Sequence, residues 1–271
     1  MAWLKKLIGL PPGENLVWWL IGKQRNIQSQ IFAFIGFIAI FWIAYQNPWA
    51  AIAMMMAMYF HELGHFIIFS LNKIKSTVLL LFPLGAVAAP VNKEEDVRSD
   101  LLPWWHIGWL LQAGPTMNAI LMFIGLILVR INLLPLLGGQ LIYINGLLCL
   151  FNLLPLVNMD GGQLFHVIFS SLKEKHETVL AVLSVVLSSL VIWIVLFSPA
   201  GLSVIGVLKS LFYNSGLILF LLLMSAGIWH KQGKDKPLHA VSTQAMTVRQ
   251  VVIQLGYYVS LLIISFILFS L

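Results

Sequence analysis

Three residues of one short segment have the types and the spacing of a metal site with an adjacent base. His61 and His65 stand four positions apart, and Glu62 directly follows the first of them in the sequence HELGH. On a helix, residues at this spacing project from one face about 6 Å apart along the axis, so both imidazoles can bind a single Zn²⁺. Glu62 then lies beside the metal, where it can act as a general base. The pattern therefore indicates a hydrolytic zinc site.

The surroundings of this segment are unusual for such chemistry. HELGH lies inside an apolar stretch at residues 49–71 that is long enough to be a membrane helix. Ionisable residues are costly in a membrane and are tolerated where a protein-lined cavity admits water. A pair of histidines hydrogen-bonded inside a helix bundle is the alternative interpretation, since buried polar groups also serve as structural partners.

A third metal ligand must come from elsewhere in the chain, because hydrolytic zinc sites normally have three protein ligands and an open position for water. Most acidic residues fall in charged loops or near the N-terminus, whereas Asp160 has an apolar setting at the end of the segment NLLPLVNMDGG, residues 152–162. Pro155 and the pair Gly161-Gly162 predict an unwound backbone there, which is allowed at membrane depth where it lines a site. The alternative role for Asp160 is to cap the helix that follows.

The composition predicts the elements that position these residues. Hydrophobic residues make up 60% of the 271 and charged residues 10%, far from the average of soluble proteins. The chain is therefore expected to be a polytopic membrane protein. Apolar runs long enough to cross a hydrocarbon core of about 30 Å predict spans near residues 28–46, 49–72, 108–131, 134–158, 178–197, 212–229 and 250–271.

The basic residues predict the orientation of these spans. With a cytoplasmic N-terminus, fourteen of the 16 basic residues fall inside, and Arg130 and Lys209 fall outside. The positive-inside rule strongly favours this arrangement for a multi-pass protein of the cell membrane. The second span then meets its first basic residue at Lys73, so His65 and His61 lie about 12 and 18 Å above that point, in the cytoplasmic half of the bilayer.

Together, the two motifs resemble those of the site-2 protease family of intramembrane zinc metalloproteases. Members of that family pair a membrane-embedded HExxH helix with a later Asn-x-x-Pro-x-x-x-x-Asp-Gly motif, and the corresponding segments here are HELGH and NLLPLVNMDGG. The resemblance implies that His61, His65 and Asp160 bind one Zn²⁺ per chain and that Glu62 is the catalytic residue. It covers roughly residues 28–170.

Two further segments resemble elements of the same family. Residues 114–118, Gly-Pro-Thr-Met-Asn, are similar to its Gly-Pro-x-x-Asn element, which packs the third span near the site. Residues 79–91 are similar in position to its membrane-associated β-loop, which engages extended substrate, although Pro83 and Pro90 limit strand pairing. The resemblance thus predicts substrate contacts at Gly85, Val87, Asn118 and Asn152. For Asn152, a helix–helix hydrogen bond is an equal alternative.

The resemblance implies an all-α polytopic membrane protein with six to seven transmembrane helices and a short membrane-associated β-loop. We expect an amphipathic N-terminal segment at residues 1–27, a metalloprotease core with the zinc motifs at 28–170, and additional transmembrane helices at 171–271. The longest polar stretches, residues 92–107 and 230–249, are too short to fold as a PDZ or CBS domain. Regulation would then come from the membrane region or from a partner protein.

The expected function is that of an intramembrane zinc endopeptidase that cleaves transmembrane segments of substrate proteins near the cytoplasmic side. Its partners would be a transmembrane protein substrate and the lipid bilayer. Nucleic acid is not expected, because the basic residues behind the net charge of +6 are divided among short loops. The alternatives are another membrane-bound zinc peptidase, an inactive protease-like binding protein, and a transporter, which would not explain Glu62 between histidines at metal spacing.

Overall fold

Five long apolar helices dominate the part of the chain that the computed structural model describes, residues 27–81, 85–154, 159–171 and 245–269. They are α3 (Ile27–Tyr45), α4 (Pro48–Leu71), α6 (Trp104–Arg130), α7 (Pro135–Asn152) and α11 (Val248–Phe269), each long enough to span a membrane. The shorter elements are α5 (Lys93–Asp100), α8 (Asp160–Ser171) and the strands β1 (Ser76–Leu81) and β2 (Gly85–Pro90). The polytopic helical fold with a β-loop is confirmed. The spans predicted at residues 178–197 and 212–229, and the N-terminal segment, lie outside the described residues.

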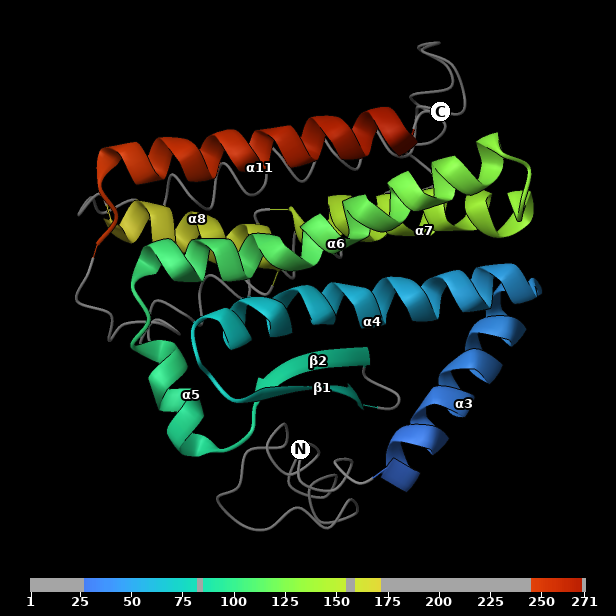
Figure 1. Ribbon diagram of the computed structural model, residues 1–271, viewed down its shortest axis with the longest axis horizontal. Helices are drawn as coiled ribbons and strands as arrows, with labels where there is room; N and C mark the ends of the chain where they lie inside the picture. Colours follow the sequence, from blue (N-terminus) through green and yellow to red (C-terminus); the bar gives the residue numbers. More distant parts are fainter. Residues whose placement is uncertain (1–26, 82–84, 155–158, 172–244, 270–271) are drawn as a thin grey trace, which may run out of the picture.

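Helix α4, which carries HELGH, occupies the middle of the molecule. In Figure 1 it lies between α6 and the β1–β2 hairpin, with α7 and α8 behind α6 and α11 along the far side of α6. Helix α3 leans from the N-terminal end of α4 toward the hairpin and contacts both. The metal motif is therefore enclosed by helices on one side and faces the hairpin on the other.

Local sequence signals define both ends of α4. Pro48 occupies the first turn, where its missing N–H costs nothing, and the Asn47 side chain accepts hydrogen bonds from the backbone of Trp49 and Ala50. At the other end, Asn72 closes the helix and Lys73 takes a left-handed conformation with φ of 58°. The chain then turns sharply into β1.

Helices α6 and α7 approach each other closely through glycine. A Cβ atom built on Gly125 would lie 2.7 Å from the carbonyl oxygen of Gly138, and one built on Gly138 would lie 2.7 Å from that of Gly125. Small residues allow this approach, and in a membrane such close packing is a main source of helix association. The α6–α7 pair forms the rigid wall behind the metal motif.

The polar stretch predicted as a loop at residues 92–107 differs from that prediction, because most of it is helical. Asn92 accepts a hydrogen bond from the Glu95 backbone and begins α5, whose first turn is acidic, while α6 starts already at Trp104. Glu95 in turn accepts from the Lys75 backbone and pairs with Arg98 at 2.9 Å. These contacts attach α5 to the start of β1.

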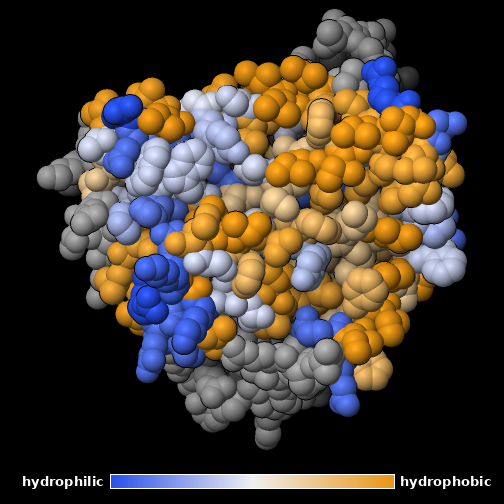
Figure 2. Space-filling view, viewed as in Figure 1, coloured by the Kyte–Doolittle hydropathy of each residue, from blue (hydrophilic) through white to orange (hydrophobic). Residues whose placement is uncertain are grey.

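The exterior of the molecule agrees with a membrane protein. Figure 2 shows that apolar side chains cover most of the visible face, whereas hydrophilic ones gather over α5. Large apolar side chains such as Phe32 on α3 and Ile131 after α6 are 75% and 61% exposed, which lipid but not water would favour. The chain is thus a multi-pass membrane protein whose charged α5 lies at one end.

Candidate metal centre

Three side chains from two distant parts of the chain converge on one point. The Nε2 atoms of His61 and His65 lie 3.3 Å apart, and the Oδ2 atom of Asp160 lies 3.2 Å from the first and 3.5 Å from the second. All three side chains are at most 13% exposed. The pairing of Asp160 with the two histidines, predicted from motifs almost a hundred residues apart, is therefore present in the structure.

The hydrogen bonds on the far side of each imidazole determine where its proton sits. The Nδ1 atom of His65 lies 2.8 Å from the carbonyl oxygen of Leu110, which can only accept. The Nδ1 atom of His61 lies 2.7 Å from Oδ1 of Asn118, whose amide nitrogen donates to Ala57 and to Asn145. Both Nδ1 atoms therefore donate, so in the neutral imidazole, which is the form that binds a metal, each Nε2 atom directs a lone pair toward Asp160.

With neutral imidazoles, this arrangement brings three electron-rich atoms close together. The Oδ2 atom of Asp160 is buried and has no hydrogen-bond partner, which is costly for a carboxylate. Atoms bound to zinc at about 2.0–2.1 Å with tetrahedral angles lie about 3.3–3.4 Å from one another. The observed separations of 3.2, 3.3 and 3.5 Å fit that geometry, so the residues present fit a zinc ion.

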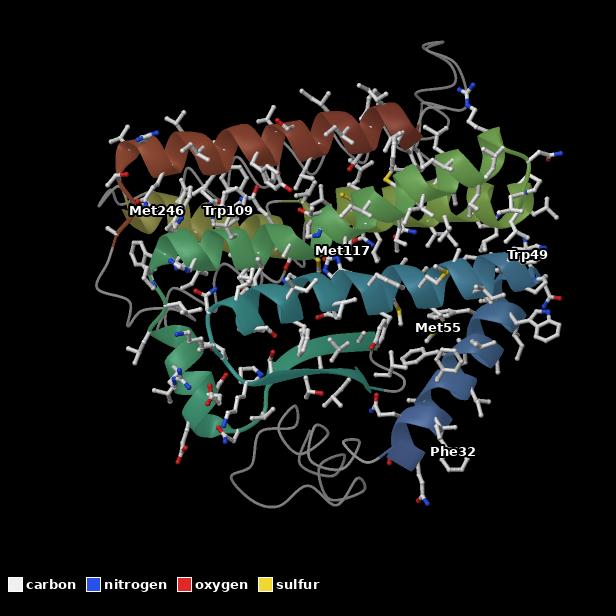
Figure 3. All side chains as sticks on the ribbon, viewed as in Figure 1. Phe32, Trp49, Met55, Trp109, Met117 and Met246 are labelled. Carbon is white, nitrogen blue, oxygen red and sulfur yellow. The ribbon has the colours of Figure 1, made fainter. Side chains whose placement is uncertain are left out.

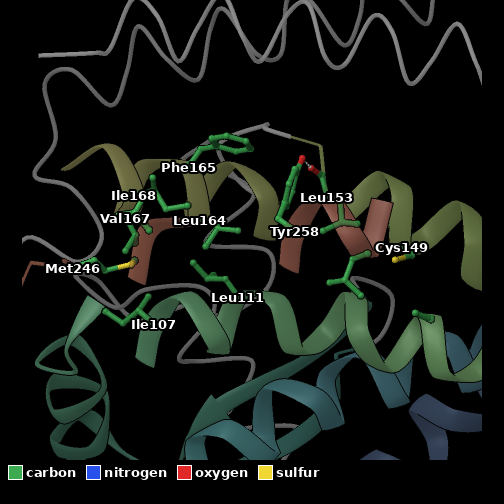
Figure 4. Packing of buried hydrophobic residues seen from close by; sticks show 13 residues of the cluster. Ile107, Leu111, Cys149, Leu153, Leu164, Phe165, Val167, Ile168, Met246 and Tyr258 are labelled. Atoms are coloured by element: carbon green, nitrogen blue, oxygen red, sulfur yellow. Dashed lines mark hydrogen bonds between the residues drawn. The ribbon is translucent and has the colours of Figure 1, made fainter. Parts of the chain in front are cut away.

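Asp160 reaches the histidines because α8 begins almost on top of the end of α7. A Cβ atom on Gly161 would lie 2.3 Å from the carbonyl oxygen of Leu153, so only glycine allows this contact. The hydroxyl of Tyr258 on α11 donates to that same carbonyl, as the dashed line in Figure 4 shows. Around it, Leu164, Phe165 and other residues of α8 pack with α6 and α11 in one apolar cluster.

Helix α6 supports the opposite side of the histidines through a second close approach. A Cβ atom on Gly64 would lie 2.4 Å from the carbonyl oxygen of Ala113, and one on Gly114 would lie 2.6 Å from ring atoms of both histidines. Figure 3 shows Met117 in this seam between α4 and α6. Pro115 cannot donate to the carbonyl of Leu111, so α6 lacks one backbone hydrogen bond next to the Leu110 carbonyl that His65 uses.

Glu62 borders this cluster of three atoms and reaches the hairpin. Its Oε2 atom accepts a hydrogen bond of 2.7 Å from the backbone N–H of Ala88 in β2. Together with the histidines it forms a group that could bind a metal, since one ligand atom from each of His61, Glu62 and His65 lies within 4.8 Å of the others. Two carboxylates therefore border the histidines: Asp160, which contacts both Nε2 atoms, and Glu62, which is hydrogen-bonded to β2.

The remaining predicted site residues lie at different distances from the cluster. Asn118 is fully buried and contacts His61, while Asn152 on α7 donates to Leu148 of its own helix at 3.0 Å. Gly85 and Val87 lie in β2, opposite Leu81 and Leu79 of β1. Direct contact of these four residues with substrate stays a prediction.

Asn145 was not among the predicted site residues; it accepts from Asn118 and donates to Leu141 while fully buried. A signal for it was available, because an amide within an apolar span must find a partner. The backbone groups of Leu110 and Ala88 that contact the site were not predicted either, because the sequence holds no signal for them. Asn118 and Asn145 form a buried amide chain that orients His61.

The fold and the site define a class of protein, a multi-pass membrane protein with a buried group of histidines and carboxylates able to bind a metal. The model of peptidase family M50, the site-2 protease family, matches residues 49–136. The matched segment includes HELGH, the hairpin and α6, and the resemblance seen in the motifs is confirmed there; Asp160 lies beyond it. No curated protein and no solved structure matches the chain.

Proposed function

We propose that the protein is an intramembrane zinc endopeptidase that cleaves transmembrane segments of other proteins. The observation that carries this proposal is the set of three separations among His61, His65 and Asp160, which fit the edges of a tetrahedral zinc site. The match of residues 49–136, which include His61 and His65, to a peptidase family also supports it.

The chain's own residues divide the chemistry among them. His61, His65 and Asp160 would hold one Zn²⁺, and Glu62 would take a proton from the attacking water and pass it to the leaving amine. A bound zinc ion activates water and polarises the scissile carbonyl. The Ala88 N–H holds the Glu62 carboxylate to one side of the ligand cluster, which leaves Glu62 outside the ligand set and available as the base.

The substrate would be extended where it is cut. A helical carbonyl already accepts an internal hydrogen bond, so a transmembrane segment must unwind locally before attack. The N–H of Ala88 faces Glu62, and since alternate residues of a strand direct their backbone groups to one edge, Ala86 faces the same edge of β2. An extended substrate pairing with this edge would lie beside the base and would use the backbone of Ala86. The backbone groups of the predicted contacts Gly85 and Val87 face β1 instead.

The proposed orientation has the N-terminus in the cytoplasm of a cell whose plasma membrane holds the protein. The distribution of the basic residues supports it, and with this orientation the site would lie in the cytoplasmic half of the bilayer. Labelling single cysteines introduced near residues 93 and 234 should find both sites on the cytoplasmic side. Labelling of residue 93 from outside would invert the depth of the site and contradict cleavage near the cytoplasm.

The experiment that tests the proposal separates the base from the ligands. In the purified full chain, Glu62→Gln should abolish cleavage of a model transmembrane substrate while zinc stays near one per chain. Asp160→Ala should lower both zinc content and cleavage, because an open three-ligand site cannot lose one ligand. Glu94→Gln on α5, an exposed carboxylate changed in the same way, is the matched control and should keep both.

Each outcome of this experiment decides one assignment. Cleavage by Glu62→Gln at the normal rate would remove Glu62 as the base. Full zinc in Asp160→Ala would return Asp160 to the role of a helix cap. Wild-type protein that holds zinc but cleaves no transmembrane substrate would contradict the proposed function itself.

A further inference from the structure

The backbone carbonyl of Leu153 lies between the end of α7 and the start of α8. Carbonyls at the C-terminal end of a helix have no intrahelical donor, so each needs a partner from elsewhere. Tyr258 of α11 is such a partner for Leu153, because its hydroxyl donates to this carbonyl (Figure 4). Both residues are buried in the apolar cluster, so water does not compete for the bond.

The same carbonyl touches the residue that follows the third candidate ligand. A Cβ atom on Gly161 would lie 2.3 Å from the oxygen of Leu153 and 2.8 Å from that of Leu154. The position of these two carbonyls therefore sets how closely α8 can begin beside α7. Gly161 directly follows Asp160, so a movement of this backbone by a few tenths of an ångström also moves the carboxylate. Metal sites hold their ligand distances to within about 0.2 Å.

The ring of Tyr258 contacts the helix that carries Asp160. It packs edge-on against Phe165 of α8, with ring centroids 5.2 Å apart and ring planes at 83°. Aromatic rings prefer this geometry, which fixes the plane of the tyrosine and thus the direction of its hydroxyl. A single side chain of α11 therefore holds the end of α7 and packs against α8 at the same time.

Two further side-chain contacts hold α11 in register with α6. Gln112 donates to Gln254, and both are almost fully buried. One turn farther along each helix, the hydroxyl oxygens of Thr116 and Tyr257 lie 2.9 Å apart. Hydrogen bonds between side chains of neighbouring helices stabilise helix packing in a membrane. The position of Tyr258 along the molecule is thereby fixed relative to α6, which also supports the two histidines.

We propose that Tyr258 is a positioning residue for the third metal ligand. Its hydroxyl holds the Leu153 carbonyl, this carbonyl fixes the approach of Gly161, and α8 then begins where Asp160 meets the two histidines. Helix α11 is thus part of the metal centre, although it carries no recognised motif and lies beyond the matched residues 49–136. The proposal rests on the metal-binding part of the proposed function.

Two adjacent tyrosines allow this role to be separated from simple helix packing. Tyr257 and Tyr258 each make one hydroxyl hydrogen bond and one edge-on aromatic contact, with Trp109 at 5.1 Å and with Phe165 at 5.2 Å. Tyr257 bonds to α6, whereas Tyr258 bonds to the connection between α7 and α8. The same substitution at the two positions therefore removes equivalent bonds, and only the bond of Tyr258 leads to Asp160.

The test measures metal binding in the purified full chain. Tyr258→Phe removes one oxygen atom and keeps the ring contact. Its zinc affinity, measured by competition with a chelator, should fall about three- to tenfold, the value of one hydrogen bond. The visible absorption of the Co²⁺-loaded protein should also change, because it reports the ligand geometry around the metal. Tyr257→Phe is the matched control and should leave the zinc affinity and the Co²⁺ spectrum unchanged.

The outcomes separate the proposal from its alternatives. Parent affinity and an unchanged Co²⁺ spectrum in Tyr258→Phe would overturn it and leave Tyr258 as a packing residue. Equal losses in both variants would also overturn it, since they would show a general loosening of α11. If Tyr258→Phe does not fold, 4-aminophenylalanine in place of Tyr258, which keeps a weaker donor, should lower the affinity about twofold, and parent affinity there would overturn the proposal. Parent protein that binds neither metal would contradict the proposed function itself.

Discussion

The two sides of α4 are built in opposite ways. On the side of α6 and α8, the backbone approaches so closely that Gly64, Gly114 and Gly161 have no space for a Cβ atom, and both imidazoles of the candidate site are oriented by hydrogen-bond partners. On the side of α3 and the hairpin, a groove of about 690 Å³ remains, and α3 has few buried residues. Metal binding demands fixed distances, whereas a transmembrane substrate needs an element that can move aside.

The largest effect is expected where the packed side has no free space. Gly114→Ala would place a methyl group 2.6 Å from ring atoms of both histidines, so the rings must move and zinc content and cleavage should fall nearly to zero. Gly139→Ala on α7 meets nothing within 4 Å and should keep both. Metal analysis of the two purified proteins checks this prediction. Normal zinc content in Gly114→Ala would show that α4 and α6 can rearrange to accommodate the methyl group.

The second prediction concerns the amide chain that orients His61. Asn118→Ala removes the acceptor of the Nδ1 proton and should lower zinc affinity about 10- to 100-fold. The matched variant Asn152→Ala loses a bond within its own helix, and its zinc affinity should not change. Competition with a chelator measures both. Equal affinities in the two variants would mean that packing alone holds the imidazole.

The third prediction compares the mobility of the two sides directly. Backbone amides of α3 should exchange with deuterium about tenfold faster or more than those of α6, because few buried residues hold α3 in place. Hydrogen exchange followed by mass spectrometry on the detergent-purified chain gives the rates. Equal exchange rates in the two helices would show that α3 is held as firmly as α6.

The smallest effect is expected from a single substitution in the transmembrane segment of the substrate. Replacing a glycine by leucine in the cytoplasmic half of its span raises helix stability by up to about 1 kcal/mol, which should slow cleavage by up to about fivefold. The same change in the outer half should matter less. Rates and cut positions from mass spectrometry test this. Cuts confined to soluble loops would indicate a membrane-anchored peptidase instead.

Much of the candidate site could be predicted from the sequence because its signals are local or chemically rare. The spacing of His61 and His65 depends only on helix geometry, and Asp160 stood out as a carboxylate in an apolar setting. The helices within residues 92–107 were predicted less well. The charges there indicated a loop, whereas the Asn92 side chain caps a helix, α5. Charge alone does not distinguish a solvated loop from a solvated helix.

By itself, the sequence determined that this is a polytopic membrane protein and which residues are the candidates for its metal site, since hydropathy and residue type are properties of the chain. Only the tertiary structure decided which groups hold those residues in place. The carbonyls of Leu110 and Leu153 and the N–H of Ala88 are backbone groups of kinds found throughout the chain. Their roles follow from which segments pack together, and that long-range packing leaves no local mark in the sequence.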